Sequence, residues 1–109
     1  MTDFRHRRST SAIVTSALLL TGGAAFGQTA QALHTRSLAA TCASCHGTDG
    51  NAVPGAEMAR LSGLPKDYIV AQMQAFREGK RPATVMHQLT KGYSDEQIDA
   101  LAAYFAGKK

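Results

Sequence analysis

The stretch Cys42-Ala43-Ser44-Cys45-His46 decides how the rest of the chain is interpreted. Two cysteines separated by two residues and followed at once by histidine are typical of the covalent attachment of a c-type haem. One helical turn can present both thiols to the vinyl groups at one edge of the ring, so that two thioether bonds form. The adjacent imidazole can then bind the iron as an axial ligand. The motif therefore predicts Cys42 and Cys45 as attachment points and His46 as an iron ligand.

Three other uses of a Cys-x-x-Cys pair fit this sequence less well. A thioredoxin-like redox pair follows a β-strand, and no strand-like apolar run precedes Cys42. A structural zinc site usually needs four protein ligands, and the sequence has no second pair of cysteines. A disulfide between Cys42 and Cys45 would close a loop too short to stabilise a fold.

Residues 1–32 have the pattern of a secretory signal peptide. Arg5, Arg7 and Arg8 precede an apolar run at residues 12–20, which is too short to span a bilayer comfortably. Small residues that suit cleavage follow, so we expect the boundary between residues 27 and 32. The alternative is an uncleaved membrane anchor, which the glycines and small residues after the apolar run disfavour.

Export would place the mature domain, residues 33–109, in the bacterial periplasm or an equivalent space, with no stable membrane span after cleavage. This domain has nine basic and seven acidic residues, and a net charge near +2 gives no reason to expect a nucleic-acid partner. With about 77 residues it is marginal for a core of its own. A covalently held haem would supply a large apolar body around which short helices can pack.

The pattern of the mature chain predicts an all-α domain of about four short helices. We expect helices at residues 33–43, from Pro65 to Gly79 and after Ser94, a loop at 47–55 and a loop or short helical turn at 81–87. Glutamine three residues after Ser94 predicts a capping box. The middle helix has a stripe of Ile69, Met73 and Phe76, and the last helix has a buried face of Ile98, Leu101, Ala102 and Phe105.

The second axial ligand is expected to be Met86, since methionine and histidine are a common pair in electron carriers. Met86 comes after a whole helix and before the last one, in a segment with few apolar competitors. Met58 and His87 are the alternatives, whereas Met73 fits the packing of an amphipathic helix. A thioether ligand would favour ferrous iron and a positive reduction potential.

Two further features have both an ordinary and a functional interpretation. Pro54 is either a turn residue or the source of the carbonyl that accepts a hydrogen bond from the His46 ring. Arg77, Lys80 and Arg81 either complement the end of a helix or include one partner for a haem propionate.

Over residues 38–105 the chain resembles small class I c-type cytochromes, and in particular the single-haem cytochrome subunit of flavocytochrome c sulfide dehydrogenase. The shared blocks lie at residues 38–42 and 45–50, at 65–68 and 72–77, and at 81–89 and 92–98, and the most specific is Arg-Pro-Ala-Thr-Val-Met-His-Gln-Leu at 81–89. The resemblance implies the class I cytochrome c fold around one haem c, attached at Cys42 and Cys45 and ligated by His46 and Met86.

The resemblance also implies a role. In that family the subunit accepts electrons from an FAD-containing subunit that oxidises sulfide, so we expect an electron-transfer protein with no catalytic residues of its own. The surface around Ala43, Ser44 and the 47–55 loop would then face the flavoprotein. A free periplasmic shuttle that serves other redox proteins and a terminal oxidase is the alternative. A haem sensor fits less well, because Met86 would block ligand entry.

Overall fold

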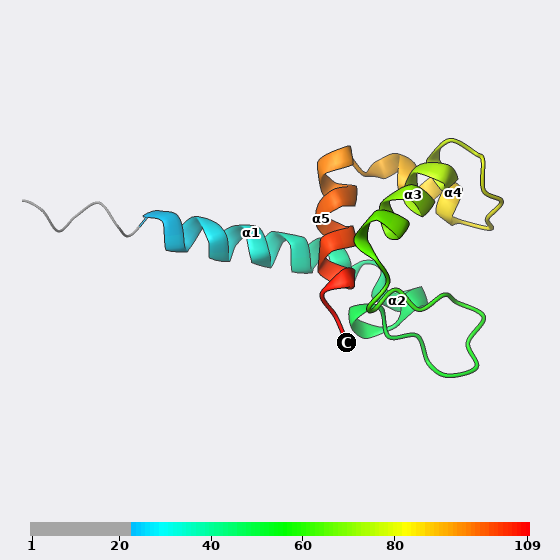
Figure 1. Cartoon of the computed structure of the whole chain (residues 1–109), viewed down its shortest axis with the longest axis horizontal. Helices are drawn as coiled ribbons and strands as arrows, with labels where there is room; N and C mark the ends of the chain where they lie inside the picture. The colour runs from blue at the N-terminus through cyan, green and yellow to red at the C-terminus, as the bar shows by residue number, and fades with distance from the viewer. Residues whose placement is uncertain (1–22) are drawn as a thin grey trace, which may run out of the picture.

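The computed structural model describes residues 23–109, and these residues form helices and loops without a β-strand (Figure 1). The all-α prediction is therefore confirmed. The α-helices are α1 (Gly23–Ala40), α2 (Ala43–His46), α3 (Lys66–Arg77), α4 (Met86–Leu89) and α5 (Asp95–Ala106). Two short 3₁₀-helices complete the order, η1 (Thr48–Gly50) after α2 and η2 (Thr90–Gly92) after α4.

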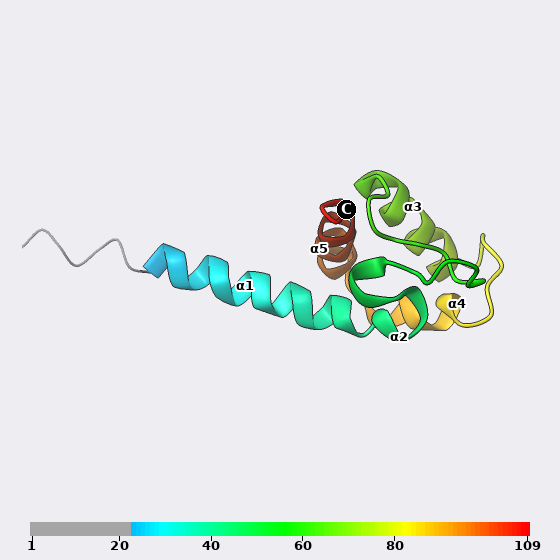
Figure 2. The ribbon, with the colours of Figure 1, turned by 90° about the horizontal axis from the view of Figure 1, so that it is seen from below.

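Most of the predicted signal peptide, residues 1–22, lies outside the described residues. The described part of that segment, residues 23–32, forms the first part of α1. In both views the beginning of α1 extends away from the other helices, and its last turn packs beside α5 (Figures 1 and 2). Within residues 23–109 no helix combines the length and the hydropathy that a bilayer crossing requires. The cleavage boundary at 27–32 stays a prediction.

The core lies where α1, α3 and α5 meet. Its buried residues are Ala39 of α1, Ile69 of α3, and Leu101, Ala102 and Phe105 of α5. The predicted face of α5 is confirmed, since Ile98 is buried as well. Of the predicted stripe on α3, Ile69 is buried, and Met73 packs against the core from a partly buried position.

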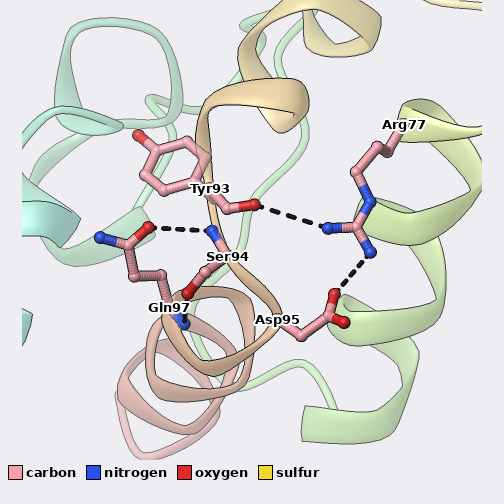
Figure 3. A network of polar contacts seen from close by, with 5 residues as sticks. All are labelled: Arg77, Tyr93, Ser94, Asp95 and Gln97. Carbon is pink, nitrogen blue, oxygen red and sulfur yellow. Dashed lines mark hydrogen bonds and ion pairs between the residues drawn. The ribbon is translucent and has the colours of Figure 1, made fainter.

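Polar groups fix the junction between α3 and α5 (Figure 3). The hydroxyl of Ser94 accepts a hydrogen bond from the Gln97 N–H at 3.2 Å, and the Gln97 side chain accepts one from the Ser94 N–H at 2.9 Å, so the predicted capping box is confirmed. Arg77, in the last turn of α3, forms an ion pair of 2.5 Å with Asp95 in the first turn of α5. Its guanidinium also donates to the carbonyl of Tyr93 at 3.5 Å. The end of one helix is thereby tied to the start of the other.

The long segment between η1 and α3 is anchored at Gly50. The Gly50 carbonyl accepts hydrogen bonds from the N–H groups of Leu61 and Ser62, at 2.9 and 3.1 Å. Gly50 is buried with φ +77°, and a Cβ at this position would lie 2.9 Å from the Phe105 ring. The Gly63 N–H donates to the Phe105 carbonyl at 3.0 Å. These bonds hold the segment against the C-terminal half of α5.

Candidate cofactor site

One cavity of about 530 Å³ opens between α2, the segment before α3, and helices α3, α4 and α5. This volume is within the range of about 300–1,000 Å³ that is usual for cofactor and ligand sites. Its wall is mainly apolar and aromatic, with a few polar side chains. The lining residues are Thr41, Cys42, Ser44, Cys45, His46, Met58, Ala59, Arg60, Leu61, Leu64, Tyr68, Ile69, Gln72, Met73, Phe76, Arg81, Thr84, Val85, Met86, Leu89, Tyr93, Leu101 and Phe105.

Both motif cysteines face this cavity. The turn after α1 and the single turn of α2 bring them there, with the His46 N–H bonded to the Cys42 carbonyl at 2.9 Å. Cys42 is half-buried and packs against the core, while Cys45 is exposed. Burial raises the pKa of the Cys42 thiol, a hydrogen bond with Thr41 lowers it in part, and the nearby Cys45 raises it further. Both cysteines therefore stand free on the wall of the same cavity.

His46 is oriented by a backbone carbonyl. Its Nδ1 lies 2.6 Å from the carbonyl oxygen of Ala59, which accepts the hydrogen bond when Nδ1 carries the proton. That tautomer leaves Nε2 as the free donor for a metal, which is the usual arrangement of an axial histidine. The sequence interpretation that gave this role to the Pro54 carbonyl was therefore wrong, because the chain turns at Pro54 and Gly55 and returns to the imidazole five residues later.

Met86 is the first residue of α4 and lines the same cavity. Its carbonyl accepts a hydrogen bond of 2.8 Å from the hydroxyl of Thr90, a fully buried residue. The backbone that carries the Met86 thioether is therefore held in place. Met58 and Met73 also line the cavity, although Met58 is 47% exposed and Met73 packs against the core. His87 does not line it, and its buried Nδ1 has no hydrogen-bond partner.

Tyr93 is a residue of the site that the sequence interpretation missed. It lines the cavity, and its hydroxyl lies 3.1 Å from the hydroxyl of Thr41, next to the first cysteine. Its carbonyl is the one that Arg77 contacts (Figure 3). Tyr93 thereby connects the start of the haem motif with the junction of α3 and α5. No local sequence pattern marks this role, because its partners are 52 and 16 residues away.

The donor set fits a c-type haem. Two thiols and an imidazole lie on one wall, a thioether is offered by α4, and the remaining surface is largely apolar. Among the described residues, no three or more His, Cys, Asp or Glu side chains gather in a group that could hold a metal ion.

Comparison with known proteins agrees with this fit. The family model described as "Cytochrome C oxidase, cbb3-type, subunit III" matches residues 29–105. The chain belongs to this family of c-type cytochromes. It therefore carries a covalently bound haem c, one per domain, and transfers electrons. The class I cytochrome c fold that the sequence predicts is confirmed by the family match and by the helical architecture.

Several characterised relatives are about 40% identical. The chain is 41% identical over 71 residues to the thiosulfate dehydrogenase electron acceptor of Thiomonas intermedia and 39% identical over 71 residues to cytochrome c4 of Pseudomonas aeruginosa. These matches cover 65% of this chain but only 33% and 35% of the two relatives, so the chain spans about a third of their length. The cytochrome subunit of sulfide dehydrogenase from Chlorobaculum tepidum is 40% identical over 68 residues, which are 62% of this chain and 60% of that protein.

Proposed function

We propose that this chain is the electron-accepting cytochrome of a periplasmic dehydrogenase that oxidises sulfide. The observation that carries the electron-transfer role is that one apolar cavity presents both the His46 imidazole and a methionine thioether, so the chain can supply both axial ligands itself. The choice of sulfide is supported by the relative that is the cytochrome subunit of sulfide dehydrogenase, and by the specific sequence block at residues 81–98.

The site residues have separate roles in this proposal. Cys42 and Cys45 would hold the haem through thioethers, the Nε2 of His46 would bind the iron, and the thioether of Met86 would be the second side-chain ligand. When bound, the haem takes up and releases one electron. The Ala59 carbonyl keeps the His46 ring in place and in the required tautomer. If the His46 imidazole and the Met86 thioether both ligate the iron, they would leave no position there for a substrate, so the oxidation of sulfide would belong to a partner.

The FAD-containing partner would dock where the motif meets the surface. Ser44 and Cys45 are exposed beside the cavity, and the neighbouring segment from residue 51 to 60 exposes Val53 (71%) and Met58 (47%). A permanent subunit buries such an apolar surface, whereas a transient shuttle docks mainly through charges. The small net charge of residues 33–109 supports the permanent complex.

The test is capture of the partner from the native host. A tagged chain is purified at high salt, the co-purified protein is analysed for FAD, and haem reduction is followed after sulfide is added. We expect a flavoprotein to remain bound and sulfide to reduce the haem much faster than it reduces the isolated chain. A solitary protein, reduced by sulfide only at the uncatalysed rate, would contradict the proposal.

A matched pair of surface variants tests the docking face. Val53→Asp should weaken capture of the flavoprotein, since it places a charge on the exposed segment next to the site. Ala71→Asp, on an exposed position of α3 that does not line the cavity, should leave capture unchanged. The haem spectrum of both variants should match that of the unmodified protein. Equal capture by the two variants would show that the flavoprotein docks on another surface.

Thiosulfate is a second candidate for the reduced sulfur compound. Two relatives are thiosulfate dehydrogenase electron acceptors, from Thiomonas intermedia at 41% identity and Stutzerimonas stutzeri at 38%. The free-shuttle alternative is supported by a relative of similar length. The match covers 86% of cytochrome c-554(548) from Halomonas halodenitrificans at 35% identity. Reduction of the captured complex by thiosulfate but not by sulfide would select the second candidate.

A further inference from the structure

Three cationic residues follow one another closely at the end of α3, and two of them already have acidic partners. Arg77 is paired with Asp95 at 2.5 Å. Lys80 is paired with Glu78 at 2.6 Å, which raises the pKa of Lys80 and lowers that of Glu78. Neither Arg77 nor Lys80 lines the cavity. Their charges are used in holding the helix end and its junction with α5.

Arg81 differs from both, because its side chain lines the cavity and its contacts are neutral. The guanidinium lies over the Phe76 ring, 4.6 Å from the ring centroid, and donates to the side-chain oxygen of Gln72. Phe76 and Gln72 line the cavity too. Within residues 23–109, none of the ion pairs involves Arg81. A half-buried guanidinium with several free donors and no anion is suited to bind a carboxylate.

The backbone fixes Arg81 at this place. Helix α3 ends at Arg77, and Gly79 takes φ +73°, which turns the chain back. The N–H groups of Lys80 and Arg81 then both donate to the Ala75 carbonyl, at 2.9 and 3.1 Å. The side chain therefore starts from a defined position and reaches the wall between α3 and the Met86 segment.

We propose that Arg81 binds a propionate carboxylate of the haem and thereby sets the charge at that edge of the cofactor. A haem carries two propionates, and a charge-assisted, bidentate pair with a half-buried arginine would satisfy one of them. Arg60 is the other arginine that lines the cavity, but its side chain is exposed, so water would screen a pair formed there. This inference rests on the presence of haem in the cavity.

The test compares Arg81→Gln, Arg81→Lys, Arg60→Gln and Arg77→Gln in the haem-loaded protein. Arg81→Gln should shift the resonance Raman propionate bending band and lower the midpoint potential, because a positive charge that favours ferrous iron is removed. Arg81→Lys should retain the potential in large part, since the charge is kept, but not the bidentate geometry. Arg60→Gln should leave the propionate band in place, and so should Arg77→Gln, which removes an arginine that does not line the cavity.

A pyridine haemochrome spectrum of each variant separates the two possible failures. If no covalent haem is found in the unmodified protein, the cofactor assignment itself fails. If haem is present and Arg81→Gln has the propionate band and the potential of the unmodified protein, the role of Arg81 is overturned. A propionate shift in Arg60→Gln alone would transfer the role to Arg60.

Discussion

Gly50 is a single residue on which the segment before α3 depends. It combines a positive φ of 77° with close neighbours, so an added methyl group would lie 2.9 Å from the Leu61 Cβ and from the Phe105 ring. We predict that Gly50→Ala lowers the free energy of unfolding of the haem-loaded protein by about 2 kcal/mol, from backbone strain and overpacking together. Unfolding curves in guanidinium chloride measure this loss of stability.

Gly55 provides the control for this prediction. Its φ is also positive, at 84°, but no atom lies within 4 Å of the position a Cβ would take. Gly55→Ala should therefore lower the free energy of unfolding by about 1 kcal/mol, from the strain of the left-handed backbone alone. If Gly50→Ala costs no more than Gly55→Ala, the close packing against Phe105 is not important for stability.

Met86 carries the prediction for the sixth ligand. Met86→Ala should abolish the weak near-infrared band of methionine-ligated ferric haem and lower the potential, because the thioether favours ferrous iron. Met73→Ala should keep the band while it lowers stability by about 2–3 kcal/mol through lost core packing. Near-infrared absorption and spectroelectrochemistry check both. Retention of the band in Met86→Ala and its loss in Met58→Ala would assign the ligand to Met58.

At the residue scale, the sequence predicted which side chains meet at the cavity but not which backbone groups hold them. Cys42, Cys45, His46 and Met86 all line the cavity, as the contiguous motif and the position of Met86 led us to expect, and their roles toward the haem stay predictions. The Ala59 carbonyl was not predictable, since every residue but proline carries the same amide and only the path of the chain decides which one meets the imidazole. Tyr93 escaped prediction for a similar reason, because its partners are distant in sequence.

The start of α5 illustrates the element scale. Ser94 and Gln97 satisfy each other's N–H groups at the first turn of the helix. We predict that Ser94→Ala lowers the free energy of unfolding by about 1 kcal/mol. Ser37→Ala, at an exposed position within α1, is the control and should change it by less than about 0.5 kcal/mol. Equal effects in thermal or guanidinium unfolding would show that the cap is not important for stability.

A second polar contact links η1 with the end of α5 and predicts a pH dependence. Tyr104 donates a hydrogen bond to Asp49, and Lys108 lies 3.5 Å from the same carboxylate. The hydrogen bond from Tyr104 is the main cause that lowers the pKa of Asp49, and the positive charge of Lys108 adds to it. Since the folded pKa is lowered, this group stabilises the fold above its unfolded pKa, and the effect is lost as the pH falls through the folded value.

Asp49→Asn should therefore be less stable than the unmodified protein at neutral pH, and the difference should disappear in acid. Asparagine tolerates the positive φ of 54° at this position, so the backbone is not strained by the change. Unfolding curves between pH 7 and strongly acidic pH measure the difference. Glu57→Gln, in the exposed segment before α3, serves as the control. A pH-independent difference for Asp49→Asn would assign its effect to packing and not to charge.

The helices with strong local sequence signals were predicted most accurately. The start and the buried face of α5 follow from its cap and its periodicity, and both are confirmed. The first helix was expected at 33–43, whereas α1 ends at Ala40 and a separate turn, α2, begins at Ala43. The break was not predictable because residues 38–43 contain no proline or glycine to mark it.

For the whole molecule, the cofactor replaces core that the chain does not have. The described residues bury only six hydrophobic side chains, and four of these form the buried face of α5. The cavity wall is drawn from α2, α3, α4 and α5 and from the segments that connect them. A ligand that fills it therefore contacts four helices at once and completes the core that they form in part.

We predict that the double variant Cys42→Ala/Cys45→Ala, isolated without haem, loses its cooperative thermal transition and much of its helical circular dichroism. An unfilled apolar cavity of about 530 Å³ leaves its walls without packing partners. Cys45→Ala alone, which keeps one attachment point, is the control and should retain haem and a cooperative transition at a lower temperature. A cooperative transition in the haem-free double variant, close to that of the holoprotein, would show that the chain folds by itself.

The hydrogen bond between His46 and Ala59 also limits how the protein can diverge. Surface segments usually tolerate insertions, but here Ala59 must reach the imidazole, and Leu61 and Ser62 must reach Gly50. The exposed turn at Pro54 and Gly55, which lies between η1 and Ala59, makes none of these hydrogen bonds. Length differences among homologues should therefore concentrate at that turn. An added residue there alters only the outline of the protein, whereas one placed between Ala59 and Leu61 would disturb either the bond to His46 or the bonds to Gly50.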